Sequence, residues 1–110
     1  MKTKIFMADE KKPRFYKNTK TNVVKIFRAL KKATENERGF MTVGDISRET
    51  GLHKWTVSRT LDLWMSYAVE CIVPEEFEQI GLRVKFVKLA NPDLTEEQVL
   101  RGLTVKLDME

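Results

Sequence analysis

The sequence of 110 residues predicts a single α+β domain, in which a three-helix bundle is followed by a β-hairpin and a short C-terminal helix. Three observations support this fold class. Apolar residues recur at helical spacing in three segments between positions 23 and 68. Two runs rich in apolar and β-branched residues follow, with a polar segment between them. A capping-box pattern then predicts the start of one more helix.

Residues 1–20 are strongly basic. They carry seven Lys or Arg against two acidic residues, which gives a net charge of +5. They show no convincing helical period and contain Pro13, so we expect a basic N-terminal arm with at most a short ordered piece. Thr21 or Asn22 is then expected to cap the first helix, which ends between Asn36 and Gly39. The apolar stripe of this helix consists of Val23, Ile26, Phe27, Leu30 and Ala33, and the cations Lys25, Arg28, Lys31 and Lys32 lie largely off it.

A second, shorter helix is predicted after a brief extended segment. Residues 39–41 are enough for one strand. Thr42 has the pattern of an N-cap for a helix that runs from Val43 to residue 49 or 50, with Asp45 as its carboxylate partner. Gly51 then marks a tight turn, where a positive φ is favourable only for glycine.

The third helix is expected from about Lys54 to Tyr67. Its buried face is predicted to consist of Val57, Leu61, Trp64 and either Met65 or Ala68. Two extended runs, 69–73 and 82–89, then predict a hairpin whose tip is polar and holds three glutamates. Cys71 lies in the first of these runs, so we expect a small core residue there rather than a redox switch.

The last helix is predicted to begin at a capping box, Thr95-Glu-Glu-Gln98, and to end at about Gly102. The resulting organisation is a basic arm over residues 1–20, a central domain over 21–92, and a C-terminal helix and tail over 93–110.

The composition argues against several classes of protein. One cysteine and one histidine cannot form an internal disulfide or a metal site, and no phosphate-binding loop or set of catalytic groups at motif spacing is present. No apolar run approaches the length of a signal peptide or of a membrane span. We therefore expect a reduced, cytoplasmic protein that is not an enzyme and needs no cofactor.

The segment from Val43 to Leu63 resembles a helix-turn-helix over its whole length. Ile46 and Val57 are apolar where the two helices must pack against each other, Gly51 supplies the turn, and Leu52 covers it from the core side. Two residues depart mildly from the usual pattern: Ser47 stands where a small apolar residue is commoner, and Thr60 is more polar than usual.

With the hairpin added, residues 22 to about 90 resemble a winged helix-turn-helix of the kind found in MarR- and ArsR-like transcription regulators, especially small archaeal ones. The resemblance implies that the third helix enters the major groove of double-stranded DNA and that the protein regulates transcription. It implies no cofactor, and the sequence identifies no small-molecule effector.

The resemblance places one face of the third helix, with Asp62 at its far end, against the bases. Arg59 is the best candidate to read a guanine, whereas Lys54 and Ser58 are expected to contact phosphates or base edges. Trp55 either touches thymine methyl groups or sugars, or packs against the first helix or the arm. The full set of expected DNA contacts is Thr42, Arg48, His53, Lys54, Trp55, Thr56, Ser58, Arg59, Arg83 and Lys85.

The hairpin leaves an alternative open. Its tip carries Glu75, Glu76 and Glu78, which would be repelled by phosphates, so either the wing stands clear of the duplex or it serves another partner. The first interpretation is favoured; the second corresponds to a winged-helix protein-interaction module in a transcription or replication assembly. Regulators of this class are usually homodimers. The dimer contacts are expected either from Ile5, Phe6, Phe15 and Tyr16 or from Leu94, Val99, Leu100 and Leu103, and both sets could equally pack on their own domain.

Overall fold

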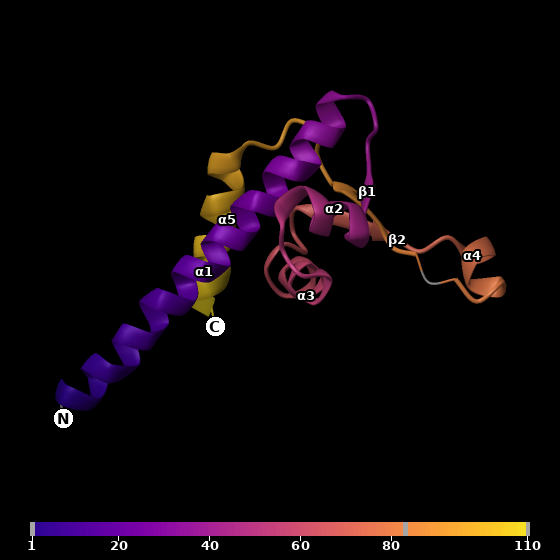
Figure 1. Cartoon of the computed structure of the whole chain (residues 1–110). Helices are drawn as coiled ribbons and strands as arrows, with labels where there is room; N and C mark the ends of the chain where they lie inside the picture. The colour runs from indigo at the N-terminus through magenta and orange to yellow at the C-terminus, as the bar shows by residue number, and fades with distance from the viewer. Residues whose placement is uncertain (1, 83, 110) are drawn as a thin grey trace.

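The computed structural model describes residues 2–82 and 84–109, with side chains over residues 18–82 and 84–108. Within these residues the chain has an α+β fold with five helices and one three-stranded antiparallel sheet (Figure 1). In chain order the elements are α1 (Lys2–Glu35), β1 (Met41–Thr42), α2 (Val43–Thr50), α3 (Lys54–Trp64), β2 (Val69–Ile72), α4 (Glu75–Gln79), β3 (Phe86–Leu89) and α5 (Glu96–Met109). The molecule measures 56 × 31 × 24 Å, because α1 continues beyond the other elements towards its N-terminus (Figure 1).

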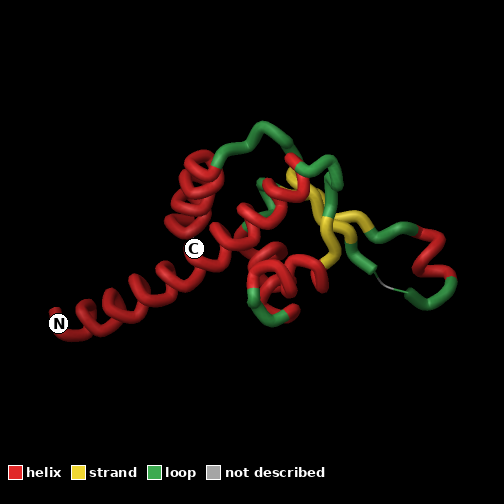
Figure 2. Tube along the Cα trace, turned by 45° about the horizontal axis from the view of Figure 1, so that its top comes forward, coloured by secondary structure: helices red, strands yellow, loops and turns green. Residues whose placement is uncertain are grey.

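α1 is the element against which the rest of the fold packs. α2, α3 and β3 contact it, and α5 lies alongside it (Figures 1 and 2). The buried stripe of α1 contains every predicted apolar position and continues back to Thr19. The fully buried residues that meet in the core include Ile26 and Leu30 of α1, Ile46 of α2, Val57 and Leu61 of α3, Val87 of β3, and Val99 and Leu103 of α5.

The start of α1 differs from the sequence-based expectation. The helix begins at Lys2, so the prediction of a largely irregular arm over residues 1–20, followed by a cap at Thr21 or Asn22, is wrong for the backbone. Most residues between positions 2 and 12 are good helix formers such as Lys, Glu, Ala and Met. A threonine or asparagine inside a helix costs only about 0.5 kcal/mol relative to alanine, which does not stop a helix whose buried stripe continues past it. Pro13 removes one backbone hydrogen bond without ending the helix.

The sheet is built around β3, in the order β1-β3-β2. β2 and β3 form the predicted hairpin, with Val69 opposite Leu89 and Ile72 opposite Phe86. β1, which confirms the strand expected near residue 41, pairs with β3 through Met41 opposite Val87. Both hairpin strands are shorter than the predicted runs, mainly because β3 begins at residue 86 instead of 82.

The tip of the hairpin contains a helix that the sequence pattern did not predict. α4 follows Pro74, and its three glutamates lie in the first turn, where a negative charge interacts favourably with the helix dipole. α4 stands at the far end of the hairpin, away from the helical core (Figures 1 and 2). Because the hairpin leaves the core after Val69, Cys71 is exposed, and the prediction of a core cysteine is wrong.

The helices that flank the hairpin also end at other positions than predicted. α3 ends at Trp64, three residues before Tyr67, and both Met65 and Ala68 are buried in the turn that follows. Trp64 itself is half-buried against the core. α5 begins at the predicted capping box, in which the Gln98 N–H donates to Thr95 Oγ1 at 3.2 Å and the Thr95 N–H donates to Gln98 Oε1 at 3.0 Å.

α5 continues to Met109, well beyond Gly102, because residues on both sides of that glycine are anchored in the core. Val99 and Leu103 are fully buried, and Leu94 and Leu100 are half-buried against the same cluster. These four residues therefore pack on their own domain. The other candidate dimer contacts, Ile5, Phe6, Phe15 and Tyr16, lie outside the residues whose side chains the structure describes.

Tyr67 connects the turn after α3 to α5. Its hydroxyl donates to the carbonyl oxygen of Val99 at 2.5 Å. Its ring lies over Gly102, where an added Cβ would be 2.5 Å from Cε2 and 2.9 Å from Cζ of the ring. Partial burial raises the pKa of Tyr67 to about 12, so the hydroxyl remains a protonated donor at neutral pH.

We expect the substitution Gly102→Ala to destabilise the fold. Overpacking of this kind costs about 1–3 kcal/mol, whereas alanine in place of a helical glycine returns about 0.5–1 kcal/mol. The free energy of unfolding, measured by urea denaturation, should therefore fall by up to about 2.5 kcal/mol. Gly44 of α2 is the matched control, because a Cβ there would meet no atom closer than 3.7 Å. Gly44→Ala should be neutral or stabilising; equal losses for the two variants would show that Tyr67 does not occupy the space over Gly102.

Candidate nucleic-acid interface

The start of α2 is fixed by a complete capping box. The Asp45 N–H donates to Thr42 Oγ1 at 3.0 Å, and the Thr42 N–H donates to Asp45 Oδ2 at 3.2 Å. The Asp45 carboxylate also accepts hydrogen bonds from Arg38 and Arg48. Partial burial raises the pKa of Asp45, but the hydrogen bonds with Thr42 and the charges of the two arginines outweigh it, so the pKa lies below its ordinary value.

The turn between α2 and α3 is closed by side chains as well as by glycine. Gly51 has a φ of 78°, as the sequence predicts. Ser47 donates its hydroxyl to the carbonyl oxygen of Leu52 at 2.5 Å, and Leu52 packs partly buried against the core. A serine therefore serves here in place of the commoner small apolar residue, because it bonds across the turn. Thr60, the other departure from the helix-turn-helix pattern, is buried.

His53 forms the N-cap of α3. The Trp55 N–H donates to His53 Nδ1 at 3.0 Å, and the histidine ring is exposed. His53 is thus a surface residue at the helix cap, and the hydrogen bond to Trp55 gives it a structural role.

The outward face of α3 is a mixed aromatic and charged surface. Trp55 is 63% exposed, so it is not buried against α1. The guanidinium of Arg59, one turn further along, lies 5.1 Å from the centroid of the indole ring. Together with Ser58, Asp62 and Leu63, these two residues line a shallow open hollow. Positions 55, 59, 62 and 63 follow helical spacing, so the periodicity of the sequence was sufficient to place Leu63 beside Trp55 and Arg59, but that residue was not among the predicted contacts.

Most cations near α3 are already paired, and two on α3 are not. Arg48 bonds to Asp45, and Lys85 lies 3.5 Å from Asp62. Within the part of the chain that the structure describes, neither Lys54 nor Arg59 forms an ion pair. The strongest uncompensated positive charge near α2 and α3 is therefore at the N-terminal half of α3.

Gly44 brings three of the predicted contacts together. A point above this glycine, where a Cβ would stand, is 3.7 Å from Thr42 Oγ1, from a terminal nitrogen of Arg48 and from Cε of Lys54. The absence of a side chain leaves the start of α2 open beside two cations. Gly44 itself was missed in the sequence analysis, and a glycine at the second position of a helix is the signal that marks it.

The remaining predicted contacts are more scattered. Thr56 and Ser58 are half-buried on α3, and Lys85 precedes β3 beside Asp62. Arg83 lies outside the described residues. The structure therefore gathers Thr42, Arg48 and Lys54 at one place and Trp55, Ser58 and Arg59 at a second place along the same helix.

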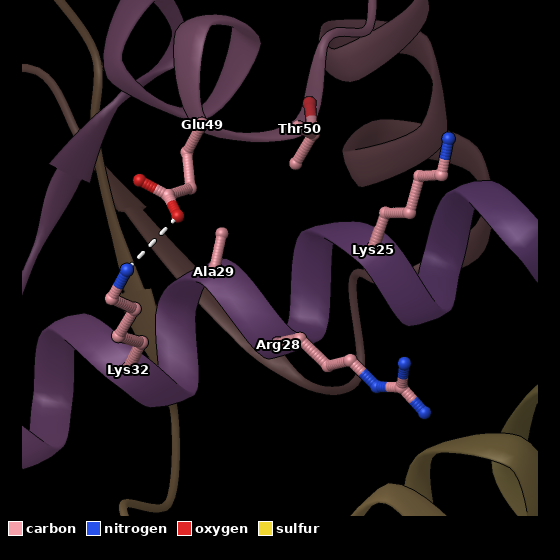
Figure 3. Close-up of a pocket in the computed structure, with 6 residues that line it drawn as sticks. All are labelled: Lys25, Arg28, Ala29, Lys32, Glu49 and Thr50. Carbon is pink, nitrogen blue, oxygen red and sulfur yellow. Dashed lines mark hydrogen bonds and ion pairs between the residues drawn. The ribbon is translucent and has the colours of Figure 1, made fainter.

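The cations of α1 that face α2, among the side chains that the structure describes, do not converge on a ligand site. A depression between α1 and α2 is lined by Lys25, Arg28, Ala29, Lys32, Glu49 and Thr50. Figure 3 shows that Lys25 and Arg28 extend in different directions and that Lys32 reaches Glu49, at 3.3 Å. Arg28 binds Glu96 of α5 with two hydrogen bonds, which raise the pKa of Arg28. These charges connect α1 to α2 and α5.

Comparisons with protein families, curated proteins and solved structures gave no match. Among the described residues, no group of three or more His, Cys, Asp or Glu side chains is arranged to hold a metal ion. In the same part of the chain, no helix is long and apolar enough to cross a membrane.

We expect Asp45→Asn to weaken the start of α2 and to change its response to acid. Loss of the Asp45 carboxylate from the capping box should lower the free energy of unfolding at pH 7 by about 1 kcal/mol. Because the folded-state pKa of Asp45 is depressed, its stabilisation is present above the ordinary pKa and is lost as the pH falls through the folded value. Denaturation between pH 7 and pH 2 should therefore show a shallower acid loss in Asp45→Asn than in wild type. Glu97→Gln, at an exposed carboxylate of α5, is the control and should leave the pH profile unchanged.

Proposed function

We propose that this chain is a winged helix-turn-helix protein that binds double-stranded DNA and regulates transcription, acting by binding and not by catalysis. The fold that supports this proposal is the α+β arrangement of α1, α2 and α3 with the β2–β3 hairpin as the wing. The observation that carries it is the outward face of α3, where Lys54 and Arg59 have no ion-pair partner in the described chain and Trp55 is exposed.

α3 has the dimensions of a reading helix. Its 11 residues correspond to a rod of about 16 Å, and the major groove, about 12 Å wide, admits one α-helix. Arg59 lies in the second turn, within reach of base edges when the N-terminal half of the helix enters the groove. Its guanidinium can donate two hydrogen bonds to a guanine.

The start of α2 supplies a second contact of a different kind. Backbone N–H groups at a helix N-terminus favour a phosphate, and here Lys54 and Arg48 lie beside the opening left by Gly44. A phosphate contact at this point would fix the position of α3 without reading sequence. The two groups of residues therefore match the division between backbone contacts and base contacts.

In the proposed complex with DNA, we place the wing on the solvent side. α4 carries three glutamates and stands away from the helical core (Figure 1). Carboxylates close to phosphates would be repelled, so the wing should not enter the minor groove.

The test is a titration of the protein with mixed-sequence duplex DNA at several salt concentrations. Wild type should bind, and the logarithm of its association constant should fall linearly with the logarithm of salt concentration between about 50 and 200 mM. The variant Lys54→Ala/Arg59→Ala should bind at least tenfold more weakly and show a smaller salt slope, since phosphate neutralisation contributes about one unit of slope per cation.

The matched control is Arg101→Ala/Lys106→Ala, which removes the same two charges from α5. α1 separates α5 from α3, so this variant should bind DNA almost like wild type. Failure of wild type to bind even near 50 mM salt would overturn the proposal, because non-specific affinity should be evident there. Equal losses in both variants would show that net charge, and not α3, carries the binding.

A second candidate function, docking of a protein on the wing, is favoured by one specific observation. Nine large hydrophobic side chains are exposed among the described residues. Four of them lie on the wing, at the end of β2 or beyond the paired strands: Ile72, Val73, Ile80 and Leu82. Ile80 is 70% exposed. We call these four residues the wing patch. Several exposed apolar side chains on one hairpin, beside acidic residues, favour a protein contact.

The charges favour a second copy of this chain as the occupant of the wing patch. The three glutamates of α4 adjoin the patch, and residues 1–20 carry a net charge of +5 together with apolar residues. The other expected dimer contacts, Leu94, Val99, Leu100 and Leu103, are covered within their own domain. The wing patch is therefore the apolar surface that stays uncovered and available for a homodimer.

Sedimentation equilibrium tests this second candidate. Wild type should self-associate, more weakly at high salt, and Ile80→Ser/Leu82→Ser should shift the equilibrium towards monomer. Val105→Ser is the control, because Val105 is also exposed but lies on α5. A monomeric wild type, or a dimer that only Val105→Ser weakens, would exclude the wing patch as the dimer contact.

A further inference from the structure

We propose that α3 recognises a pyrimidine carrying a 5-methyl group next to the guanine read by Arg59, and that Trp55 is the residue that detects the methyl group. This inference rests on the proposed DNA binding by α3. It adds the chemical class of base that the site selects.

Trp55 is an unexpected residue for a helix surface unless a partner covers it. Its indole is 63% exposed, and it makes no contribution to the buried core. Leu63, on the same outward face, is 46% exposed. The hollow between them is otherwise lined by polar and charged side chains, namely those of Ser58, Arg59 and Asp62. The exposed apolar surface of Trp55 and Leu63 favours contact with an apolar group of the ligand.

The spacing of Trp55 and Arg59 directs the two side chains to neighbouring base pairs. Residues four apart on a helix have Cβ atoms about 6 Å apart, and base pairs are stacked about 3.4 Å apart. The guanidinium lies 5.1 Å from the indole centroid, so both groups face the same one or two base steps.

The contact of Arg59 with Trp55 also prepares the guanidinium for reading. A cation over an aromatic ring is attracted to the face of that ring, and the ring provides no oxygen acceptor for the five N–H donors of the guanidinium. Within the described residues no carboxylate pairs with Arg59, so those donors have no competing acceptor of that kind. The indole therefore restricts the orientation of the arginine and offers its own remaining surface to an adjacent base.

Only one apolar group is exposed on the base edges of the major groove, the 5-methyl group of thymine. A 5-methylcytosine presents the same group at the same place. Cytosine, which lacks this methyl group, gives the indole nothing apolar to contact. The site should therefore favour thymine or 5-methylcytosine, beside guanine, over unmethylated cytosine.

The experiment begins with wild-type protein and a pool of random-sequence duplexes, from which bound duplexes are selected and sequenced. In the selected duplex each thymine is replaced singly by uracil, which removes only the methyl group, and dissociation constants are measured. One thymine next to an essential guanine should show a threefold to fivefold loss on replacement, the effect of about one buried methyl group. At that position 5-methylcytosine paired with guanine should bind more tightly than cytosine paired with guanine.

The variants identify the residue responsible. In Trp55→Ala the thymine and uracil duplexes should bind equally, even if both bind more weakly because Arg59 has lost its stacking partner. Trp55→Phe should retain part of the preference for the methyl group. Val105→Ala, at an exposed apolar residue of α5 outside this face, should leave the preference at this position intact. Circular dichroism of each variant verifies the fold.

The outcomes separate this inference from the proposed function. Wild type that binds no duplex overturns both. Wild type that binds duplexes but shows no uracil-sensitive position overturns the inference and leaves DNA binding by α3 in place. A uracil effect that is the same in Trp55→Ala as in wild type shows that another group detects the methyl, and also overturns it.

Discussion

Burial of a single apolar stripe on α1 is the interaction on which the other parts of the fold depend. Between Thr19 and Ala33 this helix offers buried side chains to α2, α3, β3 and α5. α2 and α3, with 8 and 11 residues, are too short to be stable alone, since isolated helices of fewer than about 12 residues are marginal in water. α3 and the start of α2 therefore hold their positions because each shares α1 as a common support. The polar face of α1 extends this support through the bonds from Arg28 to Glu96 and from Lys32 to Glu49.

The distribution of paired and unpaired cations follows from that architecture. Several cations around α2 and the hairpin meet acidic partners, as Arg38 and Arg48 do at Asp45 and Lys85 does at Asp62. Such exposed pairs contribute little stability individually, about 0–1 kcal/mol each, but they remove positive charge from the regions where they lie. The outward face of α3 receives no such compensation within the described residues. A modest net charge of +4 for the whole chain is thus compatible with a concentrated positive surface at one helix.

Local sequence patterns predicted the parts of the structure that local interactions determine. Capping at Thr42 and Thr95, the turn at Gly51 and the inward residues of α2 and α3 each depend on neighbours within a few positions. The errors arose where distant contacts decide. α3 ends before Tyr67 because the ring of Tyr67 packs on α5. α5 continues past Gly102 because Val99 and Leu103 are anchored in the core. In the sequence Cys71 lies in an apolar run that is typical of a core strand. In the structure the end of the hairpin extends past the helices, so Cys71 is exposed.

The same distinction applies to the candidate site. The resemblance to a helix-turn-helix implied that Lys54, Trp55 and Arg59 are exposed on one helix, and it left open whether Trp55 packs against the first helix or the arm. The approach of Lys54 to Gly44 and the pairing of Lys85 with Asp62 required the packing of separate elements, so no pattern in the sequence marked them.

The two residues of β1 have a consequence for the route by which the chain folds. Met41 pairs with Val87, 46 positions away along the chain, whereas the paired residues of the β2–β3 hairpin are at most 20 positions apart. Closing so long a segment carries an entropic cost that is repaid only when β3 is already in place. β1 should therefore join the sheet only after the β2–β3 hairpin has formed, and its loss would release the segment between α1 and α2 from the sheet.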